Sequence, residues 1–240
     1  MKTIGLIGGM SWESSIEYYR IINETAKEKL GGLHSAKSLM VTVDFAEIEK
    51  LQHEDRWDEA GQILAHCAQD LERGGADFIV LCTNTMHKLA DQMTSNVSIP
   101  LLHIADATAE KIVAAGIKRI GLLGTRFTME HDFYKGRLIH NYGLDVLIPE
   151  KTDRDIIHRV IYEELVLGKI VDASRREYQR IMNDLLAKGA EGIILGCTEI
   201  ELLITEGDSS APLFPTTNIH AIAAVEKALA SFTRSGFSPP

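Results

Sequence analysis

The sequence predicts an α/β protein with two similar halves, each built around a mainly parallel sheet. Apolar runs of strand length alternate with segments whose apolar residues recur at helical spacing, which is typical of parallel sheets covered by helices. An internal repeat indicates the two halves: KTIGLIGG at 2–9 matches KRIGLLGT at 118–125, and GADFIVLCTNT at 75–85 matches GAEGIILGCTE at 189–199. The matches keep their order along the chain, at offsets of 116 and 114 residues. A duplicated α/β unit explains both observations.

The first half shows its elements in order. The strand-length apolar runs are TIGLIG at 3–8, LMVTVDF at 39–45 and DFIVLC at 77–82. Residues 14–30 carry apolar side chains at helical spacing, and residues 60–75 do the same and close on two glycines, a common helix end. By the repeat, the second half opens with a strand near 118–125 and contains the counterpart of the third strand before Cys197.

The boundary between the halves is expected within SIPLL, where Pro100 interrupts the pattern. The segment APLFP at 211–215 is similar to a return segment and precedes a last helical pattern, NIHAIAAVEKALASF. We therefore expect a first domain of residues 1–99 plus 213–240 and a second domain of residues 100–212. Both lie within the usual size of a domain.

Composition and charge exclude several classes of partner. The net charge is −9, so no excess of Lys and Arg is available to neutralise nucleic acid or an anionic membrane. No apolar run is long enough for a transmembrane helix, and the start MKT runs into the first strand without room for a signal peptide. The 3 cysteines are an odd number and none forms a Cys-x-x-Cys pair. We expect a reduced, cytoplasmic protein without a metal site.

The repeat also pairs the polar residues that follow two matched strands. It pairs Cys197 with Thr83, Thr198 with Asn84, and Glu199 with Thr85. Cys82 is one position out of step, because its counterpart is Gly196. Neighbours along a strand point to opposite faces, so Cys82 is expected to face away from the Thr83 side chain and to be a buried core residue.

Four motifs carry a resemblance to a known family: LIGGMSWESS at 6–15, NTMH at 84–87, GTRFTMEHDFY at 124–134 and GCTE at 196–199. In this order they are similar to the aspartate/glutamate racemase family. The resemblance implies a cofactor-independent racemase with two pseudo-symmetric three-layer α/β domains, the active site in the cleft between them, and the last helix packed on the first domain. It also implies one cysteine from each domain, one to take the α-proton and one to return a proton to the opposite face. Here Thr83 stands where the first cysteine is expected.

The chemistry explains these residue types. A thiol has a pKa of about 8.5, lowered near positive charge or a helix N-terminus, so a thiolate base is attainable at neutral pH. Asn84, Thr85, Thr198 and Glu199 follow strands at turns whose N–H groups suit a substrate carboxylate. The Thr83 hydroxyl is far less acidic and is expected only to relay or donate a proton. With Cys197 intact, the resemblance implies deprotonation of L-aspartate and L-glutamate.

Further candidates lie in the loops. Met10 and Ser11 line the expected cleft; a structural turn or a phosphate loop is the alternative, although no G-x-G-x-x-G or Walker lysine occurs. Gln52 is a candidate donor to a side-chain carboxylate, and Lys169 a candidate point charge for it, with a surface helix end as the alternative. His87 and His220 fit structural hydrogen-bonding roles better than acid–base roles.

Two other functions stay open. A single-cysteine decarboxylase or cis–trans isomerase of the same superfamily also needs one thiol and an oxyanion-stabilising pocket. A small-acid binding protein is the alternative without catalysis. In each case the expected partner is a small molecule, and a homodimer is an open option for the assembly.

Overall fold

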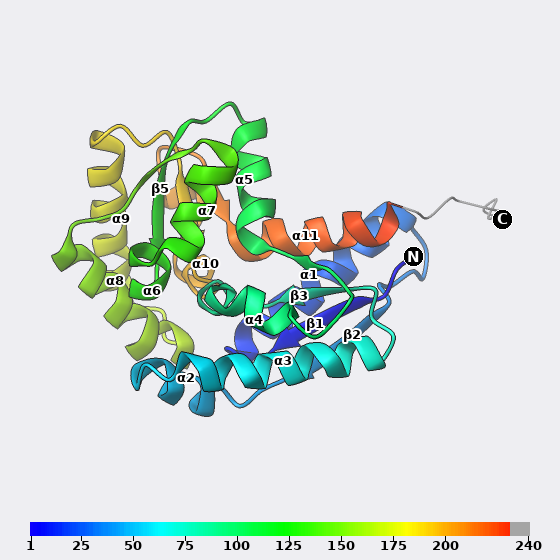
Figure 1. The fold of residues 1–240 in the computed structure, drawn as a ribbon. Coiled ribbons are helices and arrows are strands. Elements are labelled where there is room, and N and C mark those ends of the chain that lie inside the picture. Colours follow the sequence, from blue (N-terminus) through cyan, green and yellow to red (C-terminus); the bar gives the residue numbers. More distant parts are fainter. Residues whose placement is uncertain (231–240) are drawn as a thin grey trace.

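The computed structural model describes residues 1–230 and contains two parallel four-stranded sheets (Figure 1). The strand order is β2-β1-β3-β4 in the first sheet and β6-β5-β7-β8 in the second. The strands are β1 (Ile4–Gly8), β2 (Ser38–Thr42), β3 (Phe78–Leu81), β4 (Leu101–Leu102), β5 (Arg119–Gly124), β6 (Asp145–Leu147), β7 (Ile193–Gly196) and β8 (Leu213–Pro215). The prediction of two similar halves with parallel sheets is confirmed.

Helices connect these strands. They are α1 (Trp12–Leu30), α2 (Phe45–His53), α3 (Trp57–Arg73), α4 (Ala90–Thr94), α5 (Ile104–Ala114), α6 (Arg126–Glu130), α7 (Asp132–Tyr142), α8 (Lys151–Glu163), α9 (Asp172–Ala187), α10 (Ile200–Leu203) and α11 (Thr216–Leu229). Three short 3-10 helices are η1 (Thr85–Leu89), η2 (Leu165–Leu167) and η3 (Glu206–Asp208). None of the helices within residues 1–230 combines the length and the apolar character needed to cross a bilayer.

The strand register agrees with the internal repeat. In the first sheet Ile7 of β1 pairs with Leu81 of β3, and in the second sheet Leu123 of β5 pairs with Leu195 of β7. The repeat aligns Ile7 with Leu123 and Leu81 with Leu195, so the structural pairs coincide with the sequence pairs. The two residues that the repeat compares, Thr83 and Cys197, therefore follow equivalent points of two equivalent strands.

Each sheet is covered by apolar side chains, and the first sheet shows the three layers. Ile7, Ile79 and Leu81 pack on one face with residues of α3, whereas Leu6 and Val80 pack on the other face with α1 and α11. Successive strand residues point to opposite faces, which explains the alternation. The first sheet is thus sandwiched between helices, as expected.

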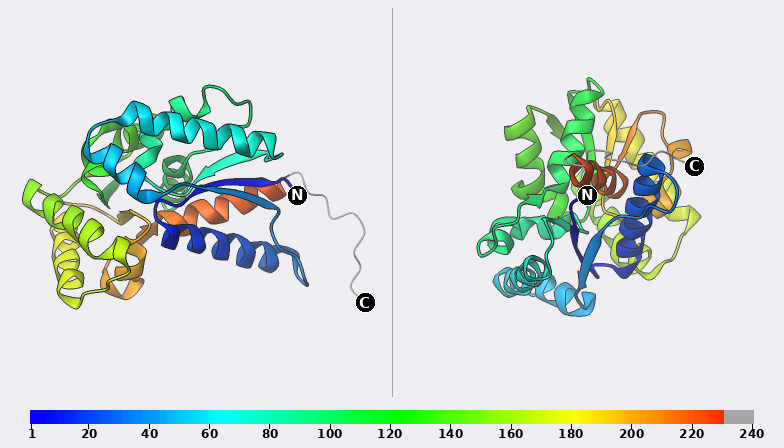
Figure 2. Two further views of the ribbon diagram at one scale, coloured as in Figure 1. Left: turned by 90° about the horizontal axis from the view of Figure 1, so that it is seen from below. Right: turned by 90° about the vertical axis from the view of Figure 1, so that its right-hand side faces the viewer.

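The helix after the last strand of each sheet packs on the opposite half. Helix α5 follows β4 of the first sheet, yet its apolar residues join the core of the second half. Helix α11 follows β8 of the second sheet, and Ala221, Ala224, Val225 and Ala228 join the core around β1 and α1. Figures 1 and 2 show α11 lying alongside α1. The halves thus exchange their last helices.

The predicted domain limits stay a prediction, but the strand pairing differs from them at two places. Leu101–Leu102 lie in the predicted second domain but pair with β3 in the first sheet. Pro100 did not end the first half, because its carbonyl accepts the Ile79 N–H at 2.9 Å and leads the chain into the sheet. Leu213–Pro215 lie in the predicted first domain but pair with β7 in the second sheet. Residues 231–240 of the predicted first domain lie outside the described residues.

Candidate active site

The loops after the central strands of the two sheets meet at the junction of the halves. Ser11, which precedes α1, donates from Oγ to Glu199 Oε1 at 2.8 Å. A second contact joins the halves the other way round: Thr125 of the second half, which precedes α6, shares a hydrogen bond with Thr85 of the first half, at 2.9 Å between their hydroxyl oxygens. Glu199 and Thr85 are partners in the repeat, and Ser11 and Thr125 each cap the helix that follows the first strand of a half, so the two contacts are related by the pseudo-symmetry. The carboxyl ends of parallel strands are where open α/β sheets bind ligands.

The loop between β1 and Ser11 requires a glycine at position 9. Gly9 has a φ of 89°, and a Cβ built there would lie 2.2 Å from the carbonyl oxygen of Val43. Only glycine fits that approach. Ser11 then caps α1 by accepting the Ser14 N–H while it donates to Glu199.

Cys197 and Glu199 form a buried pair. Cys197 donates from Sγ to Glu199 Oε2 at 3.0 Å, and Thr198 Oγ1 donates to the same oxygen at 2.7 Å. Together with Ser11, three donors therefore converge on one carboxylate. Carboxylate oxygens are hydrogen-bond acceptors, so Glu199 accepts all three of these bonds. The arrangement stores a proton on the sulfur and places a base beside it.

The electrostatics of Cys197 differ from the expectation. Burial raises the pKa of the Cys197 thiol well above its usual value, and the neighbouring Glu199 carboxylate raises it further. The backbone N–H of Glu199, at the start of α10, does lower the pKa of the thiol as expected, but burial and the Glu199 carboxylate outweigh it. A resting thiolate is disfavoured, so the carboxylate is the group able to take the thiol proton.

The first half presents neutral groups at the equivalent positions. Thr83 is buried, with 8% of its surface exposed, and its carbonyl oxygen accepts a hydrogen bond from His87 Nδ1 at 2.7 Å. Asn84 Nδ2 donates to Thr216 Oγ1 of α11 at 3.0 Å. Asn84 Oδ1 is buried and has no hydrogen-bond partner among residues 1–230. A buried carbonyl oxygen without a partner can accept a hydrogen bond from an N–H group.

Gln52 lies in a second contact between the halves. It is buried, its amide nitrogen lies 2.9 Å from Met86 Sδ, and its Oε1 accepts a hydrogen bond from the Tyr162 hydroxyl at 3.1 Å. Tyr162 belongs to α8 of the second half, and burial followed by the charges of Cys197, Glu49 and Glu199 raises its pKa. The tyrosine therefore lies within electrostatic reach of the thiol pair.

Met10 and Lys169 differ from the other candidates. Met10 is buried and its side chain joins the hydrophobic core around α3. Lys169 is exposed after η2, and within residues 1–230 no hydrogen bond or ion pair joins its side chain to the other candidates. Both remain predictions as substrate contacts.

The other two cysteines are buried in the cores. Cys82 is fully buried on the face of the first sheet that packs against α1 and α11, and Cys67 lies in the core around α3. The interpretation of both as core residues is confirmed. Neither joins the contacts at the junction of the halves.

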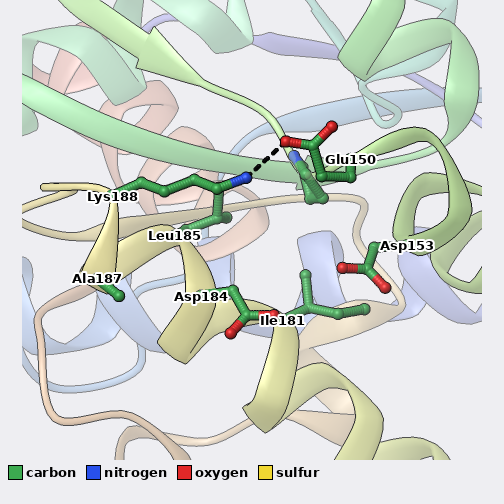
Figure 3. Close-up of a pocket in the computed structure, with 8 residues that line it drawn as sticks. Glu150, Asp153, Ile181, Asp184, Leu185, Ala187 and Lys188 are labelled. Atoms are coloured by element: carbon green, nitrogen blue, oxygen red, sulfur yellow. Dashed lines mark hydrogen bonds and ion pairs between the residues drawn. The ribbon is translucent and has the colours of Figure 1, made fainter.

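A surface concavity of about 250 Å³ lies away from this junction (Figure 3). Lys188 and Glu150 form an ion pair of 2.7 Å at its edge. Its lining residues are Pro149, Glu150, Asp153, Ile181, Asp184, Leu185, Ala187 and Lys188. None of the candidate site residues lines it. Among residues 1–230, no group of three or more His, Cys, Asp or Glu side chains is arranged to hold a metal ion.

Sequence reasoning missed several residues of the junction. Thr125 lies in the GTRFTMEHDFY motif, and Glu201 directly follows GCTEI, so both had a local signal. Tyr162 and Thr216 had none, because only the packing of α8 and α11 brings them to the site.

A comparison with known families matches residues 7–224 to the Asp/Glu/hydantoin racemases. The chain belongs to this family. Its fold is similar to that of a proposed Asp/Glu racemase from Yersinia pestis, with 55% identity and a TM-score of 0.89 over 95% of this chain and 100% of the other. An aspartate racemase homologue from Pyrococcus horikoshii OT3 has 35% identity and a TM-score of 0.82, over 95% and 99% of the two chains.

A curated relative agrees with this assignment. The broad specificity amino-acid racemase RacX of Bacillus subtilis (strain 168) is 24% identical over 180 residues, which are 72% of this chain and 74% of the relative. The protein is thus an isomerase of the racemase class. The resemblance found in the four motifs is confirmed at the level of the family.

Proposed function

We propose that this racemase acts without a cofactor on the α-carbon of the acidic amino acids aspartate and glutamate, with Cys197 as the principal acid–base group and Thr83 on the opposite face. The observation that carries the proposal is the Cys197–Glu199 pair, 3.0 Å from Sγ to Oε2, at the junction of the two halves. The Cys197 sulfur is the base that removes the α-proton, and the Glu199 carboxylate is the base that takes the thiol proton from Cys197.

The proton transfers follow from this pair. Glu199 takes the thiol proton, and the resulting thiolate removes the α-proton of the L-amino acid. The Thr83 hydroxyl then gives a proton to the opposite face of the carbanion and regains one from solvent, while Glu199 releases the former thiol proton to solvent, so that all three groups return to their starting states. An aliphatic hydroxyl is a far weaker acid than a thiol, so the step at Thr83 is the slow one. The equilibrium constant between the enantiomers does not depend on the enzyme, so a slow step at Thr83 slows racemisation in both directions. The L- and D-substrates can then differ only in the concentration at which they saturate the enzyme and in the apparent kinetic preference.

Binding is assigned to the groups around the pair. The backbone N–H groups at Asn84, Thr85, Thr198 and Glu199 suit the α-carboxylate, whose charge builds up as the carbanion forms. Asn84 Oδ1, buried and unpaired within the described residues, suits the α-ammonium. Gln52 and Lys169 are proposed for the side-chain carboxylate, and Met10 and Ser11 for the wall of the cleft. The cytoplasmic location and the homodimer stay predictions from the sequence.

The test is α-proton exchange in heavy water, measured by NMR with L-aspartate and L-glutamate. Exchange that disappears in Cys197→Ala supports the proposal, and exchange that persists in that variant refutes it. A single thiol at the junction also favours a decarboxylase, so carbon dioxide release from a substituted malonate is measured in parallel. Decarboxylation without exchange identifies that alternative, and saturable binding without either reaction identifies a binding protein.

A further inference from the structure

His87 is a buried residue of the junction that takes no part in the proposed reaction. It lies in η1, four residues after Thr83, and only 2% of its surface is exposed. Both nitrogens of its ring are hydrogen-bonded. One bond runs back to the strand end that carries Thr83, and the other runs to the start of α5.

The partners of the ring fix where its proton lies. The Thr83 carbonyl oxygen lies 2.7 Å from Nδ1, and a carbonyl can only accept, so Nδ1 carries the proton. The backbone N–H of Ile104 donates to Nε2 over 3.2 Å, so Nε2 has a free lone pair. A proton on Nε2 would oppose that N–H. The ring of His87 is therefore neutral, in the Nδ1–H tautomer.

The contact with Thr83 has no equivalent in kind at its partner in the repeat. The Cys197 carbonyl oxygen accepts a backbone N–H, that of Ile200, at 3.1 Å. The Thr83 carbonyl oxygen instead accepts from the side chain of His87. The first half thus holds its strand end through a side chain, and a substitution can remove that contact without a change in the backbone.

The donor that orients the ring is itself held in a core. Ile104 is the first residue of α5, and together with Ala105 it packs in the core of the second half. His103 caps the same helix by accepting the Ala105 N–H at Nδ1, at 3.2 Å, and its ring lies 4.4 Å from the His87 ring between centroids. The Ile104 N–H is therefore a fixed donor, and it leaves Nδ1 as the nitrogen that donates to Thr83.

The surroundings agree with an uncharged ring. His103 of α5 and His220 of α11 face it, with 6.0 Å between the ring centroids of His87 and His220. On α7, Arg137 acts on the ring through its charge, and it pairs with Asp106 of α5 at 2.6 Å. Burial first, and then these neighbours, lowers the pKa of His87 well below its usual value. No part of the ring's hydrogen bonding needs a second proton.

We propose that His87 is a positioning residue for Thr83: the N–H of Ile104 fixes the ring in the Nδ1–H tautomer, and Nδ1–H then holds the Thr83 carbonyl and with it the direction of the Thr83 hydroxyl. The effect on turnover rests on the proposed function, in which this hydroxyl gives the proton that inverts the α-carbon. Displacing a reacting group by about 1 Å can cost about a hundredfold in rate. The carbonyl contact is thus expected to matter for inversion.

Two amide substitutions separate the two contacts of the ring. In His87→Asn the amide reaches the place of Nδ1, so its N–H can still donate to the Thr83 carbonyl, while the Ile104 N–H loses its acceptor. In His87→Gln the longer side chain reaches the place of Nε2, so its oxygen can still accept from Ile104, while the Thr83 carbonyl loses its donor. Each variant is therefore the matched control of the other.

The readout is a ratio measured in heavy water with L-aspartate. Exchange of the α-proton in the recovered L-aspartate needs Cys197, whereas formation of D-aspartate, followed by chiral chromatography, also needs Thr83. We expect the ratio of D-aspartate formed to L-aspartate exchanged to fall about tenfold or more in His87→Gln and to stay within about twofold of wild type in His87→Asn. A loss of folded protein lowers both rates alike and leaves the ratio unchanged. His87→Asn should instead unfold at a lower temperature, because a buried N–H is left unpaired.

An unchanged ratio in a folded His87→Gln variant overturns the proposal, and so does a fall in His87→Asn as large as that in His87→Gln. If either variant does not fold, the long-range proton–nitrogen NMR spectrum of the histidine rings in wild type carries the test. His87 in the Nδ1–H form at neutral pH supports the proposal, and the Nε2–H form or a charged ring overturns it. This measurement needs no catalysis. A wild type that inverts neither L-aspartate nor L-glutamate refutes the proposed function, while the tautomer still decides whether His87 holds Thr83.

Discussion

The substitution Glu199→Gln tests the base at the centre of the proposed mechanism. The amide oxygen can take the place of Oε2 and accept from Cys197 and Thr198, which lie at 3.0 and 2.7 Å. The amide nitrogen then occupies the place of Oε1, 2.8 Å from Ser11 Oγ, and the hydroxyl accepts instead of donating. All three contacts survive with neutral partners, so the fold should lose less than about 2 kcal/mol of unfolding free energy.

The main effect of Glu199→Gln is expected on the rate of proton transfer. A neutral amide cannot take the thiol proton, and a positioned general base contributes about 10²- to 10⁴-fold to a rate. We expect α-proton exchange from L-aspartate at neutral pH to fall by about a thousandfold, or about 4 kcal/mol of activation free energy. The carboxylate that helps raise the Cys197 pKa is also gone, so the thiol ionises at lower pH than in wild type. Residual exchange in the variant should therefore rise with pH until the thiol is ionised.

The assay is exchange in heavy water followed by NMR across a pH series, with thermal unfolding to verify the fold. Glu206→Gln, an exposed acid of the same half, is the matched control and should exchange like wild type. Near wild-type exchange in a folded Glu199→Gln variant at neutral pH would refute the reasoning.

Three further predictions use the same exchange assay. Cys197→Ala should abolish exchange with the fold intact, whereas Cys82→Ala should keep it, because Cys82 is fully buried in the core; an equal loss in both would overturn the internal alignment. Thr83→Cys should raise exchange of D-aspartate or D-glutamate relative to the L-form, since a thiol is far more acidic than a hydroxyl; equal exchange of both enantiomers by wild type would contradict the asymmetry. Exchange should survive dialysis against a chelator, and the pure protein should lack the absorbance of a lysine–pyridoxal aldimine; activity lost to the chelator and restored by metal would contradict a cofactor-free mechanism.

Local patterns predicted most of the fold. The alternation of apolar runs with helical spacing identified the parallel sheets, and the repeat placed Thr83 and Cys197 at equivalent strand ends, which the registers of Leu81 and Leu195 support. The exchange of α5 and α11 between the halves was only partly predicted. It depends on which core buries the apolar face of a helix, and a local pattern does not contain that information.

The sequence predicted those site residues that directly follow a strand. Residues one or two positions past a strand were identified, because that geometry is local. The sequence did not predict the hydrogen bonds of Glu199 with Ser11 and of Gln52 with Tyr162, because both bonds cross the junction of the halves. The raised pKa of Cys197 was missed for the same reason: it depends on burial and on the orientation of a neighbouring carboxylate, which composition and spacing do not contain.

The exchanged helices have a consequence for unfolding. Detaching α11 from α1 uncovers the apolar face of the first sheet, and detaching α5 uncovers the core of the second half. Neither half can retain its buried surface while the other melts, and burial of apolar surface is the main stabilising contribution to folding. The chain should therefore lose both sheets in one cooperative transition, as a single thermodynamic unit built from two repeats.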